Sequence, residues 1–123
     1  MAIPSRLMGS GMSAAAATNI CGDVTNTLTA TGSTNADALA LNSAINRVST
    51  TAAGTGVILP QPVEAGAMVA VINSGANALL VYPGTGSTIN ALTATTGGFS
   101  IAAGGRALFV AVTSTSWFAV LSA

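Results

Sequence analysis

The sequence predicts an all-β protein, a small antiparallel β-sandwich or barrel for which a jelly roll is one candidate topology. Three observations support this class. Short runs alternate apolar and polar residues, β-branched residues are frequent in them, and turns rich in glycine separate them. Strands spaced by about ten residues are typical of sandwiches and barrels. The length of 123 residues favours one compact domain.

The chain divides into an extended N-terminal arm, residues 1–22, and a single β-rich domain, residues 23–123. The arm has no sustained period and carries isolated apolar residues, namely Ile3, Pro4, Leu7 and Met8. A free arm of this composition would be disordered. The alternative, which we expect, is that these apolar residues insert into a neighbouring subunit.

The domain begins with a strand and one short helix. Within residues 24–31, four threonines alternate with Val24, Asn26, Leu28 and Ala30, which indicates a strand that ends at Gly32. Thr34 and Asp37 have the spacing of a capping box, and the residues that follow are good helix formers. We therefore predict a helix over residues 35–41 in which Asp37 lies at the positive end of the helix dipole.

The rest of the domain is predicted to be β-structure. Pro60 and Pro62 end the strand predicted over residues 56–59, because proline cannot sit in a central ladder. The loop over residues 73–77 contains Gly75 and two asparagines and predicts a hairpin, and residues 114–116 predict the last one. The expected strands cover residues 45–51, 56–59, 68–72, 78–82, 88–90, 99–101, 107–112 and 117–121.

Charged residues are so few that whole classes of function are excluded. There are three arginines and three carboxylates, no lysine and no histidine, and the net charge is zero. Binding of nucleic acids or of a membrane surface requires a basic patch, which three scattered arginines cannot form. A neutral surface also favours association. We therefore expect a subunit of a larger assembly.

The sequence offers no constellation for catalysis or cofactor binding. Without histidine or lysine, Cys21 and the serines have no base to activate them, and the three separated acids do not form a metal site. A glycosidase pair made of two of the three acids is disfavoured, because a sugar site needs exposed aromatic residues and the five in this chain mostly follow core patterns. The glycine-rich residues 84–88 lack the lysine of a phosphate loop and are expected to be a turn. We expect a protein that is not an enzyme and that uses no cofactor, metal or small-molecule substrate.

A few residues are candidates for contacts between subunits. In so uncharged a chain, Arg6, Arg47 and Arg106 either pair with carboxylates in interfaces or keep their heads in solvent. Trp117 and Phe118 are adjacent on a predicted strand, so their side chains point to opposite faces. One of them should lie in the core and the other against a partner or a second sheet.

Four segments together resemble small capsid decoration, or cement, proteins of tailed bacteriophages. They are residues 28–34 (LTATGST), 50–60 (TTAAGTGVILP), 71–82 (VINSGANALLVY) and 117–121 (WFAVL). The resemblance implies a β-rich subunit, commonly a homotrimer, made in the bacterial host cytoplasm. It would bind the major capsid protein on the outer surface of the virion and reinforce the shell.

On this reading, eight residues are expected at subunit or capsid contacts: Ile3, Pro4, Arg6, Leu7, Met8, Arg47, Arg106 and Trp117. A first alternative is a phage fibre or adhesin module that binds a surface glycan, for which Tyr82 and Trp117 are the candidate aromatic pair. A second is an ice- or surface-binding protein, for which the threonines of residues 25–31 supply a single ladder.

Overall fold

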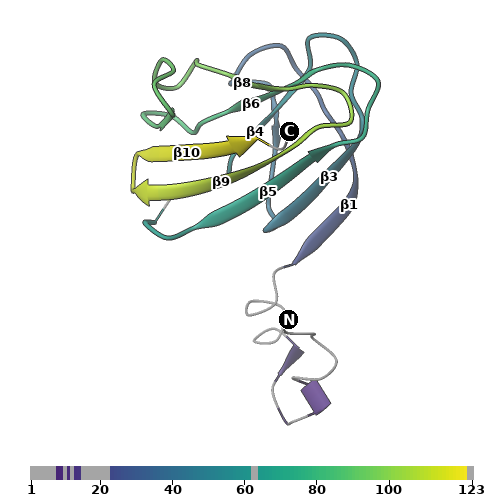
Figure 1. Cartoon of the computed structure of the whole chain (residues 1–123), viewed down its shortest axis with the longest axis vertical. Helices are drawn as coiled ribbons and strands as arrows, with labels where there is room; N and C mark the ends of the chain where they lie inside the picture. The colour runs from purple at the N-terminus through teal and green to yellow at the C-terminus, as the bar shows by residue number, and fades with distance from the viewer. Residues whose placement is uncertain (1–7, 10, 12, 15–22, 62–63, 122–123) are drawn as a thin grey trace.

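The described residues of the domain form two β-sheets (Figure 1), which together contain ten strands. The computed structural model describes residues 8–9, 11, 13–14, 23–61 and 64–121, so most of the N-terminal arm, including Ile3, Pro4, Arg6 and Leu7, lies outside the described residues. The strands are β1 (Val24–Thr29), β2 (Leu39–Ala40), β3 (Ile45–Thr50), β4 (Gly56–Ile58), β5 (Met68–Asn73), β6 (Leu79–Tyr82), β7 (Thr88–Ile89), β8 (Phe99–Ile101), β9 (Arg106–Thr113) and β10 (Ser116–Leu121).

The chain winds between the two sheets in a solenoid-like manner. The larger sheet has the order β1-β3-β5-β9-β10-β7 and the smaller has the order β2-β4-β6-β8. From β1 to β6, each strand in the larger sheet is followed by one in the smaller sheet. Successive passes therefore stack β1, β3 and β5 in parallel, and β2, β4 and β6 likewise.

The all-β class is confirmed, but the antiparallel sandwich and the jelly roll are wrong. Among the described strands, antiparallel pairs form between β9 and its neighbours β5 and β10, and between β8 and β6. The hairpin predicted at residues 73–77 is also wrong, because β5 and β6 belong to different sheets. A five-residue loop with glycine and asparagine can turn a chain back on itself or carry it to the other sheet, and local sequence does not separate the two.

The predicted helix over residues 35–41 does not form. The segment holds turns and then β2, whose Leu39 and Ala40 pair with Val57 and Ile58 of β4. Leu41 is only 1% exposed in the core. A helix of two turns is marginal by itself, and burial in the ladder outweighs its helix propensity.

The core fills the space between the sheets with side chains from alternate positions. Trp117 is 1% exposed, whereas the adjacent Phe118 is 50% exposed. The prediction that the two residues face opposite sides is confirmed, and the core position belongs to Trp117. The other fully buried apolar side chains are Leu41, Val48, Val57, Leu59, Val71, Leu79, Val81, Ile89, Ile101 and Phe109.

A buried carboxamide joins the ends of three passes of the chain. Asn73, at the end of β5, donates from Nδ2 to the carbonyl oxygens of Asn77 (2.8 Å), Ile101 (3.0 Å) and Ala102 (3.2 Å). Its Oδ1 accepts from the Thr51 hydroxyl at 2.9 Å and from the Gly75 amide at 3.1 Å. The Asn73 side chain therefore bonds two buried groups, the Thr51 hydroxyl and the Ile101 carbonyl, and three part-buried backbone groups.

Replacing Asn73 with alanine should destabilise the whole domain. The change removes the Asn73 partner of the buried Thr51 hydroxyl and Ile101 carbonyl, and each unpaired buried group costs about 1–3 kcal/mol, so we expect a loss of about 3 kcal/mol. Chemical denaturation measures this loss. Asn77→Ala is the matched control: it removes one side-chain bond, to the Thr51 carbonyl, and should cost about 1 kcal/mol. Equal losses for the two variants would contradict the central role of Asn73.

Replacing Trp117 with alanine should remove about 3–5 kcal/mol from the free energy of unfolding, because the indole fills the core. Phe118→Ala, one position further along β10, should cost far less in the isolated subunit, because half of that ring is already in solvent. Urea denaturation of both variants compares the two faces directly. Similar losses for both would show that the faces of β10 are wrongly assigned.

Candidate functional site

The outer face of the larger sheet is mostly apolar and is not covered by a second layer of the described chain. On β5, Val69, Val71 and Asn73 are buried between the sheets, so the alternate residues point outward. The same alternation on β3, β9 and β10 turns further residues to this side. We call this surface the apolar sheet face; its main apolar residues are Val24, Ile45, Met68, Ala70, Ile72, Leu108, Val110, Phe118 and Val120.

The strand register arranges these outward residues in three cross-strand rows. One row crosses five strands through Val24, Ile45, Ala70, Leu108 and Val120. A second row places Met68, Val110 and Phe118 side by side. In the third, Ile72 lies between Arg47 and Arg106. Because directly paired residues are close neighbours on a sheet, the apolar side chains form one continuous surface.

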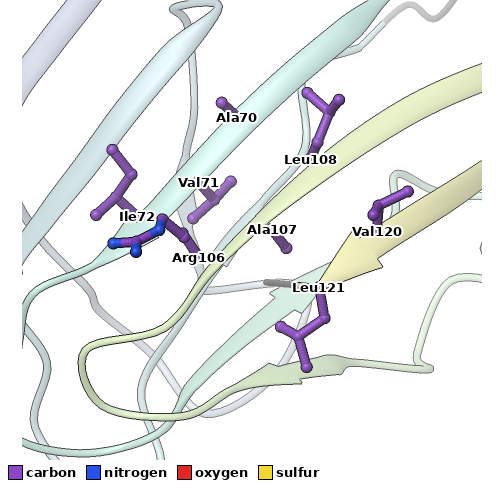
Figure 2. Close-up of a pocket in the computed structure, with 8 residues that line it drawn as sticks. All are labelled: Ala70, Val71, Ile72, Arg106, Ala107, Leu108, Val120 and Leu121. Carbon is purple, nitrogen blue, oxygen red and sulfur yellow. The ribbon is translucent and has the colours of Figure 1, made fainter. Parts of the chain in front are cut away.

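A shallow hollow of about 330 Å³ lies on this surface (Figure 2). Its lining includes the small side chain of Ala70 and the larger side chains of Ile72, Leu108 and Val120. Figure 2 shows the Arg106 side chain beside Ile72 at one end of the hollow. An apolar hollow bordered by a cation suits an apolar side chain from a partner rather than a polar substrate.

The outer face of the smaller sheet differs, because the chain's own loops pack on it. Tyr82 is only 6% exposed, and its hydroxyl donates to the Ser33 carbonyl at 3.2 Å. A Cβ added to Gly56 would lie 2.8 Å from the Tyr82 ring, and one added to Gly98 would lie 3.1 Å from it. Gly56 of β4, Gly98 in the loop before β8 and the loop that carries Ser33 therefore enclose the Tyr82 ring.

Charges lie at opposite ends of the apolar sheet face. Arg47 and Arg106 both pair with Ile72, near the end of β5. Asp23 precedes β1 and Glu64 precedes β5, so both lie at the end where the parallel strands begin. Arg47 donates to the Asn26 carbonyl at 3.2 Å, and within the described ranges neither arginine is paired with a carboxylate.

The three carboxylates lie in separate places. Asp23 accepts from the Ala44 amide at 2.9 Å, which fixes the start of β3. Glu64 is exposed in the turn before β5. Among the residues that the structure describes, there is no group of three metal-ligating side chains, and no helix there is long and apolar enough to cross a membrane.

Asp37 organises a loop rather than the start of a helix. Its Oδ1 accepts from the backbone amides of Ser33 (3.1 Å) and Thr34 (2.9 Å) and from the Thr34 hydroxyl (2.9 Å). The Thr34 amide, followed by the Thr34 hydroxyl, lowers the pKa of Asp37 below its ordinary value. The structural role predicted for Asp37 therefore holds, but its helix-dipole origin is wrong.

The structure brings together two of the eight predicted contact residues. Arg47 and Arg106 share the third row of the apolar sheet face. Trp117 is in the core, so its placement among the contact residues is wrong and Phe118 is the outward member of the pair. Met8 is 47% exposed, and the other four contact residues lie outside the described part of the chain.

Sequence reasoning missed most of the apolar sheet face, although a signal for it was present. Residues 68–72 (MVAVI) and 107–112 (ALFVAV) are apolar at every position rather than at alternate ones. A strand that is apolar on both sides is typical of a sheet covered on both faces. The described chain covers only the inner face of the larger sheet. These two apolar segments therefore indicate that its outer face is also buried against a partner.

Asp37→Asn should reduce the loss of thermal stability that the domain suffers at acidic pH. Because the pKa of Asp37 is lower in the folded than in the unfolded chain, its ionised form stabilises the fold above the ordinary carboxyl pKa. That contribution is lost as the pH falls through about 4 and below. Thermal denaturation between about pH 7 and pH 2.5 should show a smaller loss of midpoint for Asp37→Asn than for the unaltered protein. Parallel pH profiles would contradict this role.

Comparison with known proteins adds no assignment to this geometry: no protein-family model, curated protein or solved structure matches the chain.

Proposed function

We propose that this chain is a structural virion protein that binds the outer surface of a phage capsid as an oligomer and stabilises the shell. The observation that carries the proposal is the apolar sheet face, a continuous apolar surface over five strands that the described chain leaves uncovered. Exposed apolar patches of this kind mark surfaces that are buried in an assembly. The capsid as the site of assembly comes from the resemblance to decoration proteins.

The properties of the face suit a permanent contact. Its residues stand on paired strands rather than on loops, so little ordering entropy is lost on binding. Phe118 and Val120 are 50% and 65% exposed, and burying them removes apolar area from water. The two arginines at its end can pair with carboxylates of a partner and orient the contact.

The partners in this proposal are further copies of the chain and the major capsid protein. The resemblance implies a homotrimer, in which one contact repeats around a three-fold axis. An oligomer on a capsid gains avidity, because each further subunit that binds does so at high effective concentration. A nearly uncharged subunit also allows many copies to crowd on one particle without repulsion.

The structure buries the two aromatic residues that glycan binding would require. Tyr82 and Trp117 are 6% and 1% exposed, so neither ring offers a stacking surface for a sugar. The ice-binding alternative requires a flat, regular threonine ladder, whereas β1 pairs with β3 through register shifts between Thr25 and Thr29. We therefore retain the assembly function alone.

Binding to capsids tests the proposal. Heads of the phage that encodes the chain, prepared without it, should bind the purified protein on their outer surface and release their DNA at a higher temperature when coated. Co-sedimentation measures the binding. Val120→Asp places a charge on the apolar sheet face and should lower the apparent affinity at least about tenfold, because an unpaired charge is costly to bury.

The matched control is Leu92→Asp, which places the same charge on an exposed apolar residue in the turn after β7. It should bind as the unaltered protein does, and circular dichroism should show both variants folded. Failure of the unaltered protein to bind the heads would refute the capsid function. Equal binding by both variants would show that the apolar sheet face takes no part in binding to the capsid.

A further inference from the structure

We infer that the apolar sheet face pairs with the same face of a second copy of this chain, with the β5 strands of the two copies antiparallel across a two-fold axis. This inference rests on the proposed assembly function and names the partner that covers the face. It uses two observations: the separation of opposite charges along the strands, and the hollow beside Ala70.

The charges give the face two different ends. β1, β3 and β5 are parallel, so Asp23 and Glu64, which precede β1 and β5, both lie on the side where these strands begin, Asp23 beside the row of Val24 and Ala70 and Glu64 beyond Met68. The turn that carries Glu64 is held there, because the Gly66 amide donates to the Ala111 carbonyl at 2.7 Å. Arg47 and Arg106 lie towards the other end, on either side of Ile72.

With the strands of the two copies kept aligned, this polarity selects one of two symmetric ways of stacking the faces. A two-fold axis parallel to the strands would place the arginines of both copies against each other. An axis across the strands reverses their direction and places the arginine end of one copy over the acidic end of the other. Opposite charges attract when water is excluded around them, whereas like charges repel, so the second arrangement is favoured.

The lateral position of each strand is preserved by the same rotation. β5 therefore lies over β5, β3 over β3 and β9 over β9. Arg106, on β9, then faces the partner's Glu64, whose turn is bonded to β9 at Ala111. Arg47, on β3, lies near the partner's Asp23, which precedes the neighbouring strand β1 and is hydrogen-bonded to Ala44, just before β3.

The shape of the face agrees with this arrangement. Met68 projects from the acidic end of β5 and is 55% exposed, while the hollow lies around Ala70 and Ile72 towards the basic end. Reversing the strand direction carries the partner's Met68 towards this hollow. A flexible thioether side chain fills an irregular apolar space well, and each copy would contribute one such contact.

The two-fold contact predicts an even number of copies. A three-fold contact of the kind that the resemblance implies would use other surfaces, and the two together give an assembly of six. Light scattering of the purified protein over a range of concentrations should therefore show two or six copies, without any capsid present.

A charge swap tests which ends meet. Arg106→Glu places a carboxylate opposite the partner's Glu64 and should weaken self-association at least about tenfold, and Glu64→Arg should do the same by placing two arginines together. The double variant Arg106→Glu with Glu64→Arg restores opposite charges and should recover the dissociation constant to within about threefold. Both residues are exposed in the subunit, and thermal denaturation checks that each variant folds.

Met68→Ala supplies a readout that does not depend on charge and should also weaken self-association. A monomeric or three-copy unaltered protein, or a double variant no better than the single ones, would overturn the inference. Lower capsid binding by Arg106→Glu without any change in mass would assign the face to the capsid protein instead. These masses are measured without capsids, so the two proposals can fail separately. A monomer that still binds to heads would refute the pairing of the two faces and leave the proposed function standing. A dimer that does not bind to heads would support the pairing and refute the proposed function.

Discussion

The solenoid-like winding depends on the buried carboxamide of Asn73. A chain that passes back and forth between two sheets has no hairpin to close its turns, so the backbone groups at each corner need other partners. Asn73 supplies them for the corner after β5, and it also bonds Thr51, which follows β3, and the carbonyls of Ile101 and Ala102 at the end of β8. One side chain thereby joins the ends of β3, β5 and β8.

The same winding leaves one sheet without a cover. The core side chains that the structure describes form one cluster, whereas Tyr82 is buried on the outside of the smaller sheet, beside the loop that carries Ser33. The larger sheet keeps an apolar outer face because strands such as β5 and β9 carry apolar residues on both sides. The proposed contact surface is therefore a consequence of the fold: the protein has two layers but apolar residues for three, and we propose that a partner covers the outermost face.

Much of the fold could be predicted from particular residues, and the failures have physical causes. The β-rich segments were located well because alternation, proline and glycine are local signals; β4, for example, ends just before Pro60 as expected. The helix over residues 35–41 failed because Leu39 and Leu41 gain more from β-pairing and burial than from two helical turns. Of the candidate site, Arg47 and Arg106 were identified but Phe118 and Val120 were not, because which face of β10 meets the core depends on distant strands.

The sequence by itself determined the all-β class, the places where most strands lie, and a near absence of charge and of titratable groups. These properties follow from side chains and from neighbours along the chain. Only the tertiary structure decided that β1, β3 and β5 stack in parallel, that Trp117 is core while Phe118 is surface, and that Arg47 and Arg106 flank Ile72. The reason is physical: strand pairing and facing are decided by contacts between residues far apart in sequence, which local periodicity does not record.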